Sequence, residues 1–154
     1  MLFRSTETCR LAVTATFARG LPNFVTSPRR AAWGGETAVY HAMPHGLCDP
    51  LGRSVEAGAY VDTTSVHATK LKALGCHESQ HGWLQASQGM NSYLREMERM
   101  SLAMGRRSGR FRHAEGWRRH AHMGFGPPGA DPLREALGKR HRVNARYVRA
   151  SERG

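Results

Sequence analysis

Two pairs of histidines, each spaced four residues apart, are the first residues in this chain whose types and spacing could do chemistry. His77 and His81 belong to the segment His-Glu-Ser-Gln-His, which matches the His-Glu-x-x-His pattern of zinc metalloprotease helices. On a helix, this spacing places two imidazoles on one side, where they could hold a metal. Glycines flank the motif, however, and Ser79 and Gln80 interrupt an interior that should be apolar. We therefore interpret the cluster as structural polar residues at a helix end.

The second pair, His41 and His45, belongs to the segment Tyr-His-Ala-Met-Pro-His-Gly. These histidines fall on an expected strand and on the turn after it, so they do not share a helix face. A histidine that follows the C-terminal end of a strand lies where open α/β sheets bind their ligands. We predict His45 as a substrate-pocket residue, with Glu36 and Arg53 from neighbouring loops as further candidates. The alternative is a loop histidine that forms a local hydrogen bond.

Glu115 is a third candidate, because it lies in a segment that is otherwise dominated by arginine. An acid in such surroundings is expected to be ion-paired, and we predict a structural role for it. The three cysteines are widely spaced and include no C-x-x-C pair, which argues against a disulfide framework and against a zinc ribbon. We also find no Ser-His-Asp pattern, no phosphate loop and no G-x-G-x-x-G.

The positive charge of the chain is concentrated near its C-terminal end. The net charge is +11, and residues 105–154 contain 13 Lys and Arg against 4 Asp and Glu. Such a segment can attract phosphates. No aromatic interleaving, helix-turn-helix pattern or RNA-binding signature accompanies it, so nucleic acid is not expected as the main partner. The alternative function is a non-catalytic binding module that uses the arginine-rich C-terminus for an anionic partner.

The elements that must position these residues can be outlined from apolar periodicity and from Gly and Pro. Met97, Met100 and Met104 recur at helical spacing and predict a buried helix face. Gly105 is expected to end that helix, and residues 139–154 are expected to form a frayed tail. We expect helices within 6–20, 66–74, 92–104 and 131–138, and short strands within 37–43 and 59–64.

This alternation of strands and helices favours an α/β layered fold. Only two strands are evident, so we predict a partial Rossmann-like three-layer fold, with few strands packed against helices. The main domain is expected at residues 1–125, followed by a short helix and a basic tail at 126–154. No run approaches the ~20 apolar residues of a membrane span, and the start lacks the pattern of a signal peptide. We therefore expect a soluble, cytoplasmic protein.

Two segments carry motifs that occur together and in a fixed order in one known family. In residues 69–80, a Lys-rich helix start leads into Ala-Leu-x-x-His-x-Ser-Gln, through Lys70, Ala73, Leu74, His77, Ser79 and Gln80. This segment resembles the PIG-L/LmbE-like N-acetylglucosaminyl deacetylases. The segment at 107–118 resembles the family's later Arg-Gly … Tyr-Ala-Glu-Ala-Phe-Arg, with Ala114, Glu115, Trp117 and Arg118 matching. The stretches "VYHAMPHG" and "YVDTT" suit the region before the helix, and the resemblance spans roughly residues 8–120.

The resemblance implies a specific fold and activity. The family has a Rossmann-like α/β fold and binds one divalent metal, usually zinc, at the C-terminal edge of its sheet. The metal activates water to attack the N-acetyl carbonyl of an amino-sugar conjugate, with a carboxylate as base. The ligands and the base come from an Ala-His-Pro-Asp-Asp-Glu motif and from a later histidine, usually in an Asp-His pair.

This chain departs from the family at those catalytic residues. It contains no Ala-His-Pro-Asp-Asp-Glu, and no histidine precedes His41. Ser5 and Thr6 stand about where the Asp-His pair is expected, and their neutral hydroxyls are poor zinc ligands. No metal ligand can therefore be carried over, and the matching motif residues are expected to be structural. We predict a truncated family member that is inactive and binds no zinc by itself.

Overall fold

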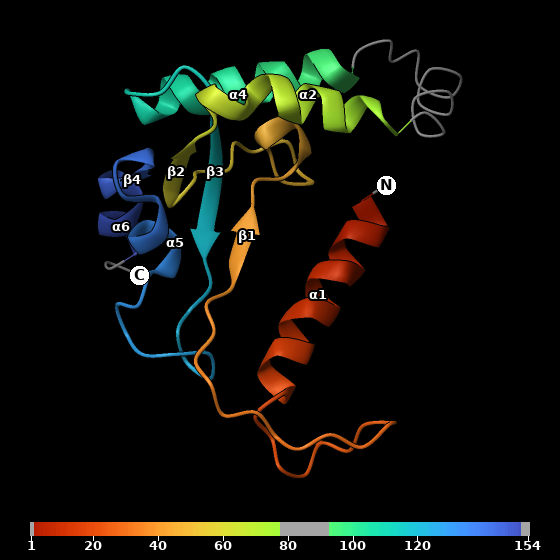
Figure 1. Ribbon diagram of the computed structural model, residues 1–154. Coiled ribbons are helices and arrows are strands. Elements are labelled where there is room, and N and C mark those ends of the chain that lie inside the picture. Colours follow the sequence, from red (N-terminus) through yellow and green to blue (C-terminus); the bar gives the residue numbers. More distant parts are fainter. Residues whose placement is uncertain (1, 78–92, 152–154) are drawn as a thin grey trace. The chain divides into compact units, whose positions relative to one another are not determined.

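The chain forms two compact units, which are described here one at a time. A computed structural model describes residues 2–77 and 93–151. The first unit comprises residues 1–40 and 119–132, and the second comprises residues 41–118 and 133–154. Figure 1 follows the chain from its N-terminus, in red, to its C-terminus, in blue.

Helix α1 (Leu2–Ala18) is the long helix of the first unit, and it confirms the helix predicted near the N-terminus. The residue after it, Arg19, fastens the helix end to two loops. Its guanidinium donates hydrogen bonds to the carbonyl oxygens of Gly35 (2.7 Å) and Phe125 (3.2 Å). The same group lies 5.0 Å from the ring centre of Trp33, a cation–π distance. One side chain thus joins segments that are far apart in the sequence.

A small four-stranded sheet lies largely in the second unit. Its strands, in the spatial order β1-β3-β2-β4, are β1 (Tyr40–Ala42), β3 (Ala114–Arg119), β2 (Ala59–Asp62) and β4 (His141–Val143). Strand β2 pairs antiparallel with both neighbours, so that Val61 lies opposite Glu115 on one side and His141 on the other. The predicted α/β class is confirmed in this coarser form, as a mixed α/β fold. A Rossmann-like arrangement requires parallel strands, which these pairings do not supply.

The sequence predicts the first two strands over longer spans and gives no indication of the other two. Strand β3 has the sequence Ala-Glu-Gly-Trp-Arg-Arg, and β4 has only three residues. Gly, Glu and Ala are depleted in strands, so propensity does not indicate β3. Pairing with β2 supplies the backbone hydrogen bonds that hold both segments extended.

Four helices and three single turns of 3-10 helix complete the described part of this unit. The turns are η1 (His45–Leu47), η2 (Thr64–Val66) and η3 (Gly138–Arg140), and the helices are α2 (His67–Gly75), α4 (Tyr93–Ser108), α5 (Pro132–Leu137) and α6 (Ala145–Ser151). Helices α2 and α4 lie side by side (Figure 1). The Tyr93 hydroxyl donates a hydrogen bond of 3.2 Å to the Leu74 carbonyl and joins them.

The prediction that Gly105 ends the long helix is wrong. Helix α4 continues to Ser108, and Gly105 is buried within it. The helix ends instead at Gly109, whose φ of +63° is the left-handed conformation common after helix C-termini. The Ser108 hydroxyl accepts hydrogen bonds from the backbone N–H groups of Arg110 (3.1 Å) and Phe111 (2.9 Å), which turns the chain toward β3.

The prediction of a frayed tail is also wrong for residues 139–151. Strand β4 pairs with β2, and Asn144 anchors the chain that follows. Its backbone N–H donates to the Gly58 carbonyl, and its side-chain amide donates to the Ala57 carbonyl, both at 2.8 Å. The same side chain accepts a hydrogen bond from the Arg146 N–H (3.2 Å), which caps α6. Short-range patterns do not reveal an anchor that depends on partners so far back in the sequence.

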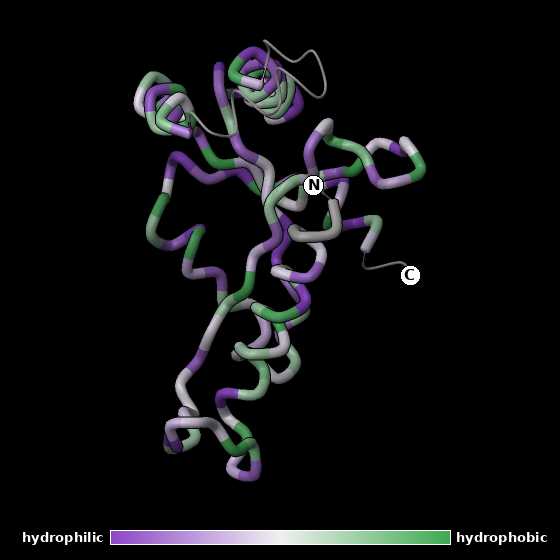
Figure 2. The backbone as a smooth tube through the Cα atoms, turned by 90° about the vertical axis from the view of Figure 1, so that its right-hand side faces the viewer, coloured by the Kyte–Doolittle hydropathy of each residue, from purple (hydrophilic) through white to green (hydrophobic). Residues whose placement is uncertain are grey.

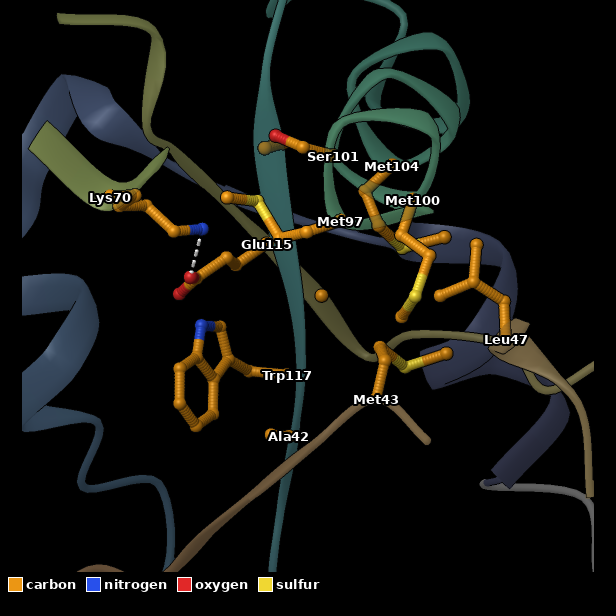
Figure 3. A pocket seen from close by; sticks show the side chains of 12 residues that line it. Ala42, Met43, Leu47, Lys70, Met97, Met100, Ser101, Met104, Glu115 and Trp117 are labelled. Carbon is orange, nitrogen blue, oxygen red and sulfur yellow. Dashed lines mark ion pairs between the residues drawn. The ribbon is translucent and has the colours of Figure 1, made fainter. Parts of the chain in front are cut away.

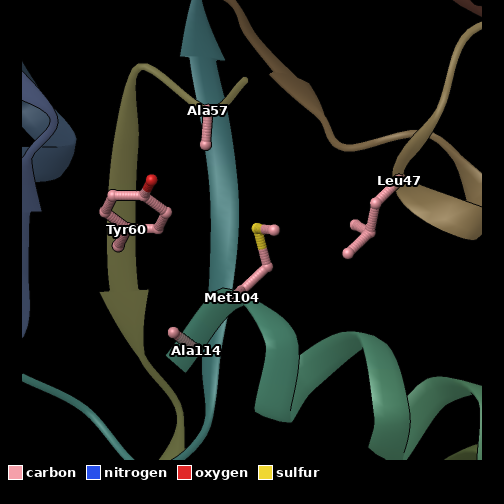
Figure 4. Packing of buried hydrophobic residues seen from close by; sticks show 5 residues of the cluster. All are labelled: Leu47, Ala57, Tyr60, Met104 and Ala114. Carbon is pink, nitrogen blue, oxygen red and sulfur yellow. The ribbon is translucent and has the colours of Figure 1, made fainter. Parts of the chain in front are cut away.

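The core of the second unit lies between α4 and the sheet. Its buried members are Leu47, Ala57, Tyr60, Met104 and Ala114 (Figure 4). Met104 is only 2% exposed and Met100 packs against the cluster, which confirms the predicted core packing for these two methionines of the stripe. Tyr60 reaches into the cluster from β2, and Ala114 from the start of β3.

Hydrophobic and hydrophilic residues are interspersed along the tube drawn in Figure 2. Among the helices of the described residues, none combines the length and the apolar character that a membrane crossing requires.

Candidate functional site

An ion pair between α2 and β3 joins the two segments that carry the sequence motifs. Nζ of Lys70 contacts Oε1 of Glu115, and Figure 3 shows the two side chains pointing toward each other. The side chains are 28% and 37% exposed, so the pair is partly shielded from water. The predicted ion pairing of Glu115 is confirmed, but its partner is a lysine and not one of the neighbouring arginines. Arg118, for example, stacks on Tyr147 at 5.2 Å.

The ion pair lies at a cavity of about 210 Å³ inside the second unit. Methionine side chains from α4 and from the β1–η1 loop form much of its wall, and the Trp117 indole lies beneath the pair (Figure 3). The residues that line it are Ala42, Met43, Leu47, Lys70, Met97, Met100, Ser101, Met104, Ala114, Glu115, Gly116 and Trp117. An apolar wall with a few polar groups is the usual composition of a small-molecule pocket.

The polar groups of this cavity suit binding better than proton transfer. Lys70 and Glu115 are in contact, so each is already engaged by the other side chain. No histidine, cysteine or threonine lines the cavity, and the Ser101 hydroxyl has no hydrogen-bond partner within the described ranges. A serine without a neighbouring base is a weak nucleophile. The arrangement can therefore orient a polar group of a small ligand, but it has no nucleophile–base pair.

A second cluster joins α2 to the segment before β3, through two stacked histidines. The rings of His67 and His113 lie 3.7 Å apart at an interplanar angle of 16°. They are 8% and 6% exposed, respectively. Both ring nitrogens of His67 and Nδ1 of His113 lack a hydrogen-bond partner within residues 2–77 and 93–151. The two rings therefore stack face to face in a buried position where few polar groups reach them.

The environment of His113 makes this stack sensitive to pH. Burial lowers the pKa of His113, and the neighbouring His67, Arg112 and Lys70 lower it further, whereas Glu98 raises it. The unfolded chain therefore binds more protons than the folded chain below about pH 6.5, the ordinary pKa of histidine. The stability contributed by a neutral His113 is present above that pH and is lost as the pH falls toward the lowered pKa.

We expect the variant His113→Gln to lose less stability than the parent chain between pH 7.5 and pH 5, because it removes the group that resists protonation. Urea unfolding at several pH values measures the difference. His122→Gln is the matched control, because His122 is exposed and should leave the pH dependence unchanged. Parallel curves for His113→Gln and the parent chain would contradict the prediction.

The three residues predicted to contact substrate do not all belong to one unit. Glu36 is exposed in the first unit, while His45 and Arg53 are exposed in the second. His45 begins the turn η1, next to Leu47 of the cavity wall, but it does not line the cavity itself. The backbone N–H of Arg53 donates to Oδ1 of Asp49 (2.8 Å) in a separate turn. Their roles in substrate contact stay predictions.

The structure brings two of the predicted family-motif residues into contact. Lys70 and Glu115 meet at the cavity, whereas His77 is exposed just after the end of α2. Ser79 and Gln80 lie outside the described residues, as does the second histidine of the His-Glu-x-x-His pattern. The cavity wall and the histidine stack were missed by sequence reasoning. The sequence signal for the cavity wall is the methionine stripe, but the same stripe equally predicts a filled core.

The zinc that the family resemblance implies does not fit the residues described. Within residues 2–77 and 93–151, no group of three His, Cys, Asp or Glu side chains is placed to hold a metal ion. The histidine stack offers two nitrogen donors at most from its parallel rings, whereas a catalytic zinc site requires three protein ligands. We therefore derive no step through a metal from these residues.

Comparisons of the chain with protein families, with curated proteins and with solved structures found no match.

Proposed function

We propose that this chain is the C-terminal portion of a metal-dependent deacetylase domain of the PIG-L/LmbE-like kind. The substrate class is an N-acetylglucosamine conjugate, whose N-acetyl amide is hydrolysed. The observation that carries the proposal is the contact between Lys70 and Glu115, because each belongs to a different motif of the resemblance. Two motifs chosen by chance would have no reason to meet in space.

The other matching segments support the same proposal, because they fold around this contact. "YVDTT" supplies most of β2, which leads through η2 into α2, and β2 pairs directly with β3. "VYHAMPHG" supplies β1 and the start of η1, and β1 lies on the other side of β3. The resemblance thus corresponds to neighbouring elements of one unit.

Within this proposal, the residues of this chain position and enclose the substrate, and they do not take part in the reaction itself. The Lys70–Glu115 pair links α2 to β3, and the methionine side chains give the cavity a largely apolar wall. Metal, ligands and base belong to a segment that carries the Ala-His-Pro-Asp-Asp-Glu motif. The parallel strands of the Rossmann-like core belong to that segment too. A reducing, cytoplasmic location is part of the proposal, and three widely spaced cysteines without a C-x-x-C pair agree with it.

A fusion tests this function directly. The N-terminal half of a deacetylase of this family, including its metal motif, is joined to the present chain. We expect the fusion to release acetate from an N-acetylglucosamine conjugate, while this chain alone and the N-terminal half alone release none. A folded fusion that releases no acetate from several such conjugates would contradict the proposal.

Exchange of the ion pair tests the contact itself. We expect Lys70→Glu or Glu115→Lys alone to lower the free energy of unfolding by about 1 kcal/mol, because each places like charges in contact at a partly shielded site. The double exchange restores the opposite charges and should recover most of the loss. Denaturant unfolding of the four proteins gives the coupling energy. Additive losses in the double variant would show that the two side chains do not interact.

A further inference from the structure

The second unit carries exposed arginines from two segments that are far apart in the sequence. The C-terminal end of α4 and the turn after it supply Arg106, Arg107 and Arg110, and β4 supplies Arg142. Nη1 of Arg142 lies 3.9 Å from the position that a Cβ would take on Gly109. The guanidinium of Arg142 therefore lies beside the turn at Gly109, which follows Arg106 and Arg107 at the end of α4 and precedes Arg110. We name these four residues the arginine surface.

The environment of Tyr60 independently places two of these groups near each other. Burial and the carboxylate of Glu56 raise the pKa of the Tyr60 hydroxyl, while Arg107 and Arg142 lower it. Both guanidiniums therefore act on the same side chain, although they come from different elements. Two positive charges in the same surroundings repel each other, and an added anion would reduce that repulsion.

Glu56 is a carboxylate that shares the surroundings of Tyr60 with Arg107 and Arg142, and it forms no ion pair with either arginine in the described residues. No ion pair joins any of the four to a carboxylate in the described part of the chain. Arg107 donates instead to the Val55 carbonyl (3.0 Å) and to the Ser54 hydroxyl (3.1 Å). The C-terminal elements add further exposed cations, Lys139, Arg140, Arg146 and Arg149, and Glu135 is the one carboxylate in residues 133–151.

We propose that the arginine surface binds the sugar-phosphate backbone of a nucleic acid. Guanidinium groups form paired hydrogen bonds with phosphate oxygens, and a polymer of phosphates can engage several arginines at once. Contacts to the backbone carry no base information, so no base-reading motif is required. A lipid surface fits less well, because membrane-surface helices insert large apolar side chains. Within residues 133–151, Val143 is the one large hydrophobic side chain that is exposed, and its exposed fraction is 38%.

Salt dependence of DNA binding tests the proposal. Fluorescence anisotropy of a labelled DNA duplex with the full chain should show binding that weakens about 100-fold between about 50 and about 200 mM salt, as expected for four phosphate contacts. The double variant Arg110→Gln/Arg142→Gln should bind more weakly and should reduce the slope of log K against log salt by about 2.

The matched control is Arg29→Gln/Arg30→Gln, which removes the same charge from exposed residues of the first unit. It should leave the slope unchanged, and thermal unfolding verifies that both double variants are folded. Absence of DNA binding at about 50 mM salt would overturn the proposal, as would equal effects of the two double variants. It would also be overturned if phosphatidylserine vesicles displaced the duplex at equal phosphate, because the surface would then suit lipid.

Discussion

The variant Gly105→Ala should lose about 3 kcal/mol of unfolding free energy, because a methyl group has no room at this buried position of α4. An added Cβ would lie 2.7 Å from the carbonyl carbon of Arg112 and 2.8 Å from the carbonyl oxygen of Phe111, and it would overlap the Arg112 carbonyl oxygen. These neighbours are backbone atoms, so no rotamer change relieves the overlap. Helix α4 would have to move away from the segment that leads into β3.

Gly75→Ala is the matched control for this experiment. Gly75 is the last residue of α2, and no heavy atom of the described residues lies within 4 Å of the position of its added Cβ. Alanine has the higher helix propensity, so this change should raise stability slightly, by up to about 1 kcal/mol. Denaturant unfolding of both variants measures the contrast. If Gly105→Ala is as stable as the parent chain, α4 does not pack against residues 111–112 as described.

The second large effect is expected for Met104→Ala, which should lower the unfolding free energy by about 2 to 5 kcal/mol. Met104 is 2% exposed and belongs to the buried cluster between α4 and the sheet (Figure 4). Truncation removes its packing contacts and enlarges the neighbouring cavity, which Met104 also lines. Met104→Leu nearly conserves the volume and should cost less than about 1.5 kcal/mol.

Met123→Ala provides the control for the loss of a methionine side chain. Met123 is 75% exposed in the first unit, so its truncation should change stability by no more than about 0.5 kcal/mol. Chemical denaturation of the three methionine variants gives all the values. Similar small losses for Met104→Ala and Met123→Ala would contradict the position of Met104 in the core.

Most of the helices could be predicted because their signals are local, but α6 lies in the segment that was predicted to be a frayed tail. Asp131 and Pro132 mark the start of α5, and the methionine stripe gives the buried face of α4. Strands β3 and β4 could not be predicted in this way, because pairing with β2 holds them extended. The sequence predicts a helix end at Gly105. In the structure, the missing side chain of Gly105 instead allows the backbone of residues 111–112 to approach α4 closely.

The candidate site shows the same division between local and distant signals. Lys70 and Glu115 belong to two separate sequence motifs, and only the fold places α2 against β3 and brings the two charges into contact. The cavity is built from methionines that are also core residues, so side-chain type alone does not distinguish a wall from a filled core. The arginine surface likewise depends on β4, which lies in the segment that the sequence predicts to be a frayed tail.

The zinc content of two purified proteins tests the central claim most directly. We expect elemental analysis after equilibrium dialysis to find no retained zinc in this chain, and stoichiometric zinc in the fusion that supplies the Ala-His-Pro-Asp-Asp-Glu motif. That result would place the metal centre in the added half and the supporting elements here. Stoichiometric zinc retained by this chain alone would contradict the account, because its own histidines would then build a site.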